Sequence, residues 1–305
     1  MAPSFAEATA VKAIDSHTYA VHLDTEWCVG SVPHGGVITS VFLRVAATHF
    51  NTTLAAQNQP HTISLHLEFL RRTQEGAGTL TVRDVKLGRQ TSTVHISLSQ
   101  DGREEVVGYL TRSNMHTESG VSLTTKWTLQ PAPRPPPVDF AALLAGGEDP
   151  NWVEQTDHPF PKFRKVSHRV RNCLPRAGQV LPGVIDQWLR FESGEPFTDE
   201  SIGFVADHFP SVIVELWHAE RHDKPPAFWF PTVVLNLDVK KTLPPEGVEW
   251  LFLRVRSTSI KNGRMDLEVV ILDMAGEVVA LSHHVVLVVG AERNLAARGN
   301  GQTKI

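Results

Sequence analysis

The sequence predicts an α+β protein in which a helix followed by an antiparallel meander of strands occurs twice. Residue-level matches between the two halves support this duplication. Thr62–Phe69 (TISLHLEF) corresponds to Thr232–Val239 (TVVLNLDV). A Gly-Arg pair followed by a turn and Glu-Val-Val also occurs in both halves, at 88–107 and at 263–279. Recurrence of the same units in the same order indicates two copies of one fold in a single chain.

In the first half, a strand is expected within residues 10–28, where Tyr19, Val21 and Leu23 alternate with other residues. A helix is expected at Val37–Phe50, because its apolar residues recur at intervals of three and four and form one face to be buried. The strands expected after this helix are Thr62–Leu70, Gly78–Leu87, Thr91–Ser99 and Glu105–Ser113.

The second half is expected to repeat this order. A strand at Lys165–Asn172 and an apolar segment at Trp188–Phe197 precede a helix at Thr198–Phe209, which Pro210 ends. The strands expected after it are Phe228–Val239, Trp250–Thr258, Met265–Asp273 and Val278–Val289. The prolines of 131–137 predict a stiff linker, and 138–164 an irregular connector. The predicted domains are 1–130, a connector at 131–164, 165–292, and a tail at 293–305.

Composition limits the classes of function. The 305 residues carry a formal net charge of −4, so nothing electrostatic favours nucleic acid or an anionic membrane as a partner. Two cysteines are too few for a disulfide framework, and no secretory signal, membrane span or peroxisomal ending is visible. We therefore expect a cytoplasmic protein.

Asp207 and Thr232 are the first candidates for chemistry. In the predicted helix Thr198–Phe209, Ile202, Val205 and Phe209 share one side, and Asp207 lies at its margin. A carboxylate there is costly unless it is paired, and such positions are enriched in function. On periodicity alone, a surface carboxylate at Asp207 and a threonine chosen for strand propensity at Thr232 remain the simpler interpretations.

Two histidine-containing motifs are further candidates. His34-Gly35-Gly36 opens the first helix, where free backbone N–H groups and the helix dipole favour a developing oxyanion, although Gly-Gly is also ordinary turn chemistry. In Val278–Val289, alternation places Ser282, His284 and Val286 on one face and His283 on the other, so one of these histidines faces inward.

At this point the order of motifs resembles the double hotdog acyl-CoA thioesterases, including the acyl-CoA thioesterase II family. The four matching segments are Pro33–Gly36, Phe204–Pro210, Phe230–Val239 and Gly276–His284. The resemblance implies a tandem double hotdog fold. It also implies that a helix aspartate, a strand hydroxyl and a glutamine hold the attacking water. In this sequence the aspartate position is Asp207 and the hydroxyl position is Thr232. The glutamine position is occupied by His284, which departs from the family pattern.

The predicted function is hydrolysis of an acyl thioester, bound to CoA or a carrier protein, by direct attack of water. Asp207, Thr232 and His284 would position and deprotonate the water, and His34, Gly35 and Gly36 would receive the oxyanion. Three consecutive aromatic residues, Phe228, Trp229 and Phe230, would line the acyl pocket. No cofactor or metal is expected, because the fifteen histidines show no metal-ligand spacing and no phosphate-binding loop or serine nucleophile motif is present.

Two alternatives remain open from the sequence. A hotdog scaffold that dehydrates or otherwise transforms an acyl or polyketide intermediate is favoured by histidine at position 284, since dehydration needs a histidine and an acid. A non-catalytic acyl-binding protein is the other, because a fold does not determine function. Hotdog units pair helix to helix within this duplicated chain, and the resemblance implies a homodimer beyond that.

Overall fold

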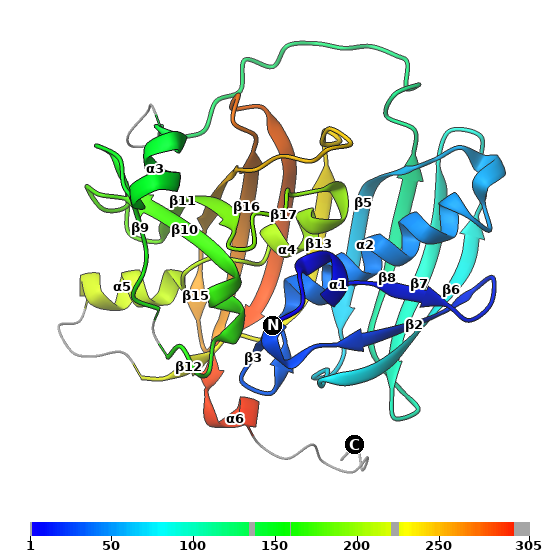
Figure 1. Ribbon diagram of the computed structural model, residues 1–305, viewed down its shortest axis with the longest axis horizontal. Coiled ribbons are helices and arrows are strands. Elements are labelled where there is room, and N and C mark those ends of the chain that lie inside the picture. Colours follow the sequence, from blue (N-terminus) through cyan, green and yellow to red (C-terminus); the bar gives the residue numbers. More distant parts are fainter. Residues whose placement is uncertain (1, 134–137, 159, 221–225, 296–305) are drawn as a thin grey trace.

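The computed structural model describes residues 2–133, 138–158, 160–220 and 226–295, and Figure 1 shows curled strands in both halves, with α2 and α4 lying against them. The elements of the first half are α1 Phe5–Ala8, β1 Val11–Ala13, β2 Thr18–Leu23, η1 Thr25–Trp27, β3 Cys28–Val29, β4 Val32–Pro33, α2 Gly35–Asn51, η2 Ala55–Gln57, β5 His61–Phe69, β6 Gly76–Lys86, β7 Ser92–Gln100 and β8 Arg103–Ser113. The predicted order of one long helix followed by four antiparallel strands is confirmed. The predicted four-strand meander is wrong in one respect: only β6, β7 and β8 are neighbours in chain order, and β5 pairs with β8 instead of β6.

The elements that follow are α3 Phe140–Gly146, β9 Trp152–Glu154, η3 Lys165–Arg169, β10 Val170–Pro175, β11 Val184–Phe191, η4 Asp199–Ser201, α4 Ile202–Val205, α5 Val212–Glu220, β12 Phe228–Trp229, β13 Thr232–Val239, β14 Leu251–Arg256, β15 Ile260–Lys261, β16 Arg264–Leu272, β17 Val278–Leu287, β18 Val289–Gly290 and α6 Glu292–Leu295. The second half therefore also places a helical segment before its antiparallel strands, and β13 pairs with β17 just as β5 pairs with β8. The predicted α+β duplication is confirmed.

Alternation along the strands and periodicity along α2 explain the core. Buried and half-buried residues alternate without interruption along β7. Ile38, Val41 and Val45 of α2 are fully buried, and each such side chain stabilises the fold by roughly 1.5–3 kcal/mol relative to an exposed one. Because α2 lies between the sheet and the second half, it is buried on more than one side.

The two halves share one antiparallel sheet, with the strand order β1-β2-β6-β7-β8-β5-β13-β17-β16-β14-β11-β10-β9. Its centre is the pairing of β5 with β13, in which Leu67 lies opposite Leu235 and His66 opposite Asn236. These are the two strands whose sequences match between the repeats. The duplicated copies therefore meet through equivalent edges, which removes two exposed strand edges.

The helices also meet at the boundary between the halves, where α2 packs on η4 and α4. Glycines allow this approach. A Cβ atom on Gly203 would lie 2.8 Å from Cγ2 of Thr39 and 2.9 Å from the backbone nitrogen of Ser40. A Cβ atom on Gly36 would lie 2.8 Å from Cα of Phe204. Any larger side chain at either glycine would force the helices apart.

The predicted helix Thr198–Phe209 is wrong in extent. Only η4 and α4 are helical, and α4 ends at Val205, so Asp207 follows the helix instead of lying within it. Pro210 lacks an N–H group and opposes further helical turns here. The chain becomes helical again in α5, which the sequence did not predict.

The expectation of an irregular connector at 138–164 is also wrong, although residues 134–137 and 159 lie outside the described part of the chain. This stretch contains α3 and β9, and β9 extends the main sheet by pairing with β10. Leu143 and Trp152 are buried with Trp188 and Trp250 in a second, smaller core. The expected strand at Lys165–Asn172 likewise begins only at Val170.

In the part of the chain that the structure describes, no helix has the length and apolar character needed to cross a membrane. The predicted tail at 293–305 begins inside α6, and residues 296–305 lie outside the described ranges.

Candidate active site

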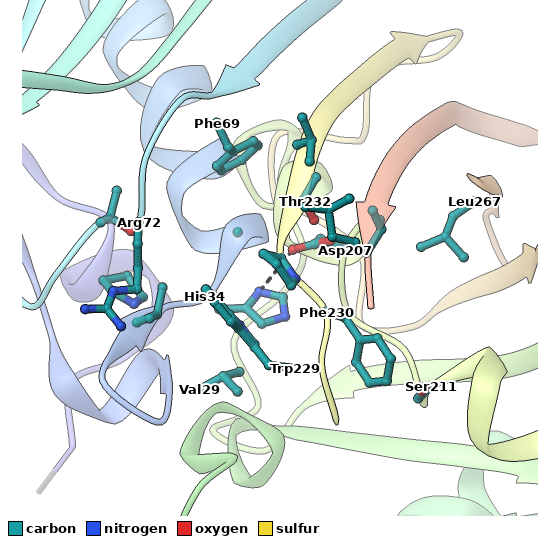
Figure 2. Close-up of a pocket in the computed structure, with 18 of the residues that line it drawn as sticks. Val29, His34, Phe69, Arg72, Asp207, Ser211, Trp229, Phe230, Thr232 and Leu267 are labelled. Carbon is teal, nitrogen blue, oxygen red and sulfur yellow. Dashed lines mark ion pairs between the residues drawn. The ribbon is translucent and has the colours of Figure 1, made fainter. Parts of the chain in front are cut away.

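The structure brings Asp207, His34, Thr232 and His284 together where the first half meets the second. His34 is the N-cap residue of α2, Asp207 follows α4, and Thr232 and His284 come from the neighbouring strands β13 and β17. Figure 2 shows Thr232 beside Asp207, with the His34 ring directed at the carboxylate. Residues separated by up to 250 positions thus surround one carboxyl group.

Asp207 is deeply buried, with 11% of its side chain exposed. One carboxylate oxygen, Oδ2, lies 3.7 Å from Nδ1 of His34, and the other, Oδ1, lies 3.6 Å from Nδ1 of His284. Burial raises the pKa of Asp207 from 3.8 to about 7, while the Gly36 N–H and the Thr232 hydroxyl oppose this rise by stabilising the anion. Asp207 is therefore balanced between its acid and base forms near neutral pH.

Hydrogen bonds define which nitrogen of His284 carries the proton. The Ser282 hydroxyl donates to the backbone oxygen of Asn236 at 2.5 Å, so its oxygen must accept from Nε2 of His284, 2.8 Å away. The proton then lies on Nε2, and Nδ1 presents a lone pair to Asp207. Burial, assisted by the neighbouring charge of His283, lowers the pKa of His284 to about 3, so the ring is neutral. His284 is inward-facing, as one of the two predicted alternatives required.

The start of α2 supplies hydrogen-bond donors. Nδ1 of His34 accepts the N–H of Gly36 at 3.1 Å and so caps the helix. Burial, together with the positive charge of Arg164, lowers the pKa of His34 to about 3, which keeps the ring neutral. The N–H of Gly35 has no acceptor among the described residues, and Gly35 lines a cavity. This donor is free to bind a ligand oxygen.

Gly35 also permits the carboxylate to approach α2. A Cβ atom at this position would lie 2.7 Å from Oδ2 of Asp207, closer than real contacts allow. The absence of a side chain therefore brings a general-base candidate and a free N–H donor to the same point.

Thr232 reaches the cavity because of an irregularity in β13. The pairing of β13 with β17 shifts between Thr232 and Val234, which is the signature of a β-bulge. Consecutive residues of a regular strand face opposite sides, yet both Thr232 and Val233 line the cavity. The bulge turns the threonine hydroxyl toward Asp207.

The cavity at this site has a volume of about 500 Å³. Its wall includes Asp207, His34, Gly35 and Thr232. His284 does not line the cavity, although its ring lies 3.6 Å from the Asp207 carboxylate. Four arginines also line it: Arg71, Arg72, Arg164 and Arg293. Among the described lining residues Asp207 is the only acidic one, so the cavity is cationic in a chain whose net charge is negative.

A second chamber of about 660 Å³ shares six lining residues with the first: Val29, His34, Arg164, Phe209, Ser211 and Phe230. Its wall is largely apolar and includes Phe160, Phe163, Leu174, Val214 and Phe228. The predicted aromatic segment is therefore divided: Trp229 lines the first cavity, Phe228 the second, and Phe230 both. Arg164 and the chamber were not predicted, because their residues lie in stretches without periodicity.

A separate group of side chains could hold a divalent cation. His49 and His17 each direct Nε2 at the carboxylate of Asp84, at 3.0 Å and 3.3 Å, and their Nδ1 atoms contact the hydroxyls of Tyr19 and Ser16. These hydrogen bonds also satisfy all three side chains without a metal. Sequence spacing could not reveal this group, since its members come from a turn, the end of α2, and β6.

Comparison with known proteins agrees with the fold and the motifs. Residues 23–113 match the acyl-CoA thioesterase N-terminal domain family, and residues 129–288 match the acyl-CoA thioesterase C-terminal domain family. The thioesterase-like protein TwmA of Talaromyces wortmannii is 37% identical over 98% of this chain and 96% of its own length.

Solved structures show the same architecture. A putative thioesterase II from Thermobifida fusca YX superimposes with a TM-score of 0.72 at 21% identity, covering 95% of this chain and 99% of its own. The acyl-CoA thioesterase II TesB2 of Mycobacterium marinum gives 0.62 at 18% identity, covering 95% and 100%. A hot dog protein of unknown function from Alicyclobacillus acidocaldarius gives 0.71 at 17%, covering 95% and 99%. With its two matched domains and its tandem hotdog fold, the chain belongs to the acyl-CoA thioesterase II-like family.

Proposed function

We propose that this protein hydrolyses an acyl thioester by direct attack of water, with Asp207 as the general base. The observation that carries the proposal is a carboxyl group with a pKa of about 7 in a cavity wall, next to the free N–H of Gly35. A base is most effective when its pKa lies near the working pH. A free N–H at the start of a helix is suited to a developing oxyanion.

The reaction follows from these positions. A water held by Asp207 and the Thr232 hydroxyl transfers a proton to the carboxylate as its oxygen attacks the thioester carbonyl carbon. The carbonyl oxygen becomes an oxyanion that accepts a hydrogen bond from the Gly35 N–H. When the intermediate collapses, the carbon–sulfur bond breaks, and protonated Asp207 returns the proton to the leaving thiolate. The products are a carboxylic acid and a thiol.

His284 acts in this proposal as a positioning residue, because it does not reach the cavity. Its unprotonated Nδ1 faces Oδ1 of Asp207 at 3.6 Å, so it gives the anion no hydrogen bond. It can instead accept a hydrogen bond from the protonated carboxyl group, which stabilises the acid form of Asp207. We infer that the histidine favours the acid form of Asp207, whereas a glutamine amide would donate to the carboxylate and favour the anion.

The arginines of the first cavity favour an anionic thioester carrier. Arg71 and Arg293 are exposed, and Arg72 is half-buried between the mouth and the interior. Arginine is suited to binding phosphate oxygens. CoA and the phosphopantetheine arm of a carrier protein both present phosphate groups, so the carrier would enter through this cavity. The apolar second chamber would then take the acyl group.

A second candidate function is elimination of water from a β-hydroxyacyl thioester. It is favoured by one observation: His34 from the first half and Asp207 from the second both line the cavity, 3.7 Å apart. A histidine base and a carboxylic acid are the groups that such an elimination requires. Nδ1 of His34 already accepts the Gly36 N–H, which makes hydrolysis the better-supported reaction. A binding protein without catalysis would need neither the raised pKa nor the free donor.

The test is an assay of wild type and Asp207→Asn with acyl-CoAs of several chain lengths and one β-hydroxyacyl-CoA. Release of free thiol reports hydrolysis, and absorbance of the conjugated enoyl thioester reports elimination. Thiol release that depends on Asp207 supports the proposal. Enoyl formation without thiol release would replace hydrolysis by dehydration, and ligand binding with neither signal would leave a binding protein.

A further inference from the structure

Arg164 is an unpaired cation in the wall between the two cavities. Its side chain lines both of them, and no described residue forms a hydrogen bond or ion pair with its guanidinium group. Burial lowers its pKa, and no acidic neighbour offsets this effect. Glu292, the acidic residue in the described wall of the second chamber, lies beyond ion-pair distance. Arg164 is half-buried, and it lines both cavities.

The two fully buried arginines in the described part of the chain, Arg254 and Arg112, are both paired. Arg254 forms two hydrogen bonds of 2.6 Å with the carboxylate of Asp186. Arg112 donates to the hydroxyl of Thr62 at 2.7 Å and to backbone oxygens. A buried charge without such partners is strongly unfavourable. An unpaired arginine facing a cavity therefore indicates that its partner belongs to a ligand.

The wall of the second chamber has further unsatisfied polar groups. Oδ1 of Asn172, Nδ1 of His208 and Oγ of Ser211 are buried without hydrogen-bond partners among the described residues. Buried polar atoms are normally paired, so three exceptions around one chamber require an explanation. A chamber built only for a hydrocarbon chain would not need these groups or Arg164.

We propose that Arg164 binds an anionic group on the acyl part of the substrate, so that the preferred substrates are acyl thioesters carrying a carboxylate. This inference rests on the proposed hydrolysis and names its substrate class. The thioester carbonyl would lie at Gly35 and Asp207, the carrier among the arginines of the first cavity, and the carboxylated acyl chain in the second chamber beside Arg164. A planar guanidinium group binds a carboxylate through two parallel hydrogen bonds.

A phosphate of the carrier is the other source of negative charge that could reach Arg164. The position of Arg164 favours the acyl group, because this arginine alone of the four also lines the apolar chamber. The two sources predict different substrate dependence. A carboxylate on the acyl chain is present in some substrates only, whereas the carrier phosphates are present in all.

The experiment measures kcat/KM for octanoyl-CoA and for the mono-CoA thioester of octanedioic acid, which differ only in the terminal carboxylate. Wild type, Arg164→Met, Arg164→Lys and the matched control Arg293→Met are compared by the ratio of the two values. We expect wild type to prefer the carboxylated substrate by roughly tenfold to a hundredfold, the range for a hydrogen bond to a charged group. Arg164→Met should remove this preference, Arg164→Lys should keep part of it, and Arg293→Met should leave the ratio unchanged.

Three results would overturn the inference. The first is a wild type whose kcat/KM is the same for both substrates, and the second is a preference for the carboxylated substrate that survives Arg164→Met. The third is an equal loss of kcat/KM for both substrates in Arg164→Met, which would assign Arg164 to a carrier phosphate. If wild type hydrolyses neither thioester, the proposed hydrolysis fails separately. Calorimetry with free octanedioic and octanoic acids then tests Arg164 directly: tighter binding of the diacid that Arg164→Met abolishes supports the anion site, and equal binding refutes it.

Discussion

Replacing Asp207 by asparagine should make the protein both inactive and more stable. Burial raises the pKa of this carboxyl from 3.8 to about 7, a shift of about 3 pH units. At 1.36 kcal/mol per unit, ionised Asp207 lowers the free energy of unfolding by about 4 kcal/mol above pH 7. Asparagine keeps the shape, carries no charge, and can donate its amide N–H toward the unprotonated Nδ1 of His284.

The sign of the pH dependence follows from the two pKa values. Between about pH 4 and pH 7 the unfolded chain has lost the Asp207 proton while the folded protein keeps it, so folding is linked to proton binding. The contribution to stability is therefore full below pH 4 and declines until pH 7. The stability advantage of Asp207→Asn should be about 2 kcal/mol at pH 5 and about 4 kcal/mol at pH 8.

Thermal unfolding of both proteins from pH 5 to pH 8 measures this difference. A chain of this size gains roughly 1.5 °C in Tm per kcal/mol, so the variant should unfold about 3 °C above wild type at pH 5 and about 6 °C above it at pH 8. Thiol release should fall by roughly 10²- to 10⁴-fold, the usual loss on removing a general base. A Tm difference that does not grow with pH would refute the raised pKa, and retained turnover would refute the role as base.

Four further outcomes are expected. The kcat/KM of wild type should rise with pH through a single limb near pH 7, measured by thiol release, because only ionised Asp207 can accept the proton of water. His284→Gln should move this rise of kcat/KM to lower pH, by about one unit, since an amide donor stabilises the carboxylate. A rise at the unchanged pH would exclude the proposed effect of His284 on Asp207. Gly36→Ala should lower Tm, because the new Cβ atom would meet the backbone of Phe204. Gly35→Ala should chiefly reduce kcat, because its Cβ atom would displace the Asp207 carboxylate. Equal effects of the two variants on Tm and kcat would contradict this difference. Arg164→Met should raise Tm by a few degrees, on the order of 1–2 kcal/mol, because it removes an unpaired charge; a loss of Tm would indicate a structural partner.

The strands were predictable because each has one clear pattern. In β5 to β8, apolar residues alternate with polar ones and turns separate the runs, so the predicted bounds differ from the observed ones by at most two residues. The second helix was not predictable in the same way. Residues 198–209 have helical spacing, yet α4 ends at Val205, before Pro210, and Asp207 contacts Gly36 and Thr232 of other elements.

The members of the site could be predicted, but their roles could not. The family motifs identified Asp207, Thr232, His284 and His34, and the structure places these four within one region. Whether His284 reaches the cavity depends on how β17 faces Asp207, and its protonated nitrogen depends on Ser282 and a backbone oxygen. Neither fact is encoded in spacing along the chain. Arg164 was missed because no local pattern distinguishes a cavity-lining arginine from an exposed one.

The duplication explains why one site, and not two, is expected. The first half has a helix of 17 residues whose start offers a free N–H, but residues 39–44 of that helix contain no acid. The second half has the carboxylate, but its helix α4 has only four residues. Each half therefore supplies what the other lacks. Because Gly36 and Gly203 set the distance between the two helices, the chemistry of the site depends on packing at this boundary as directly as on Asp207 itself.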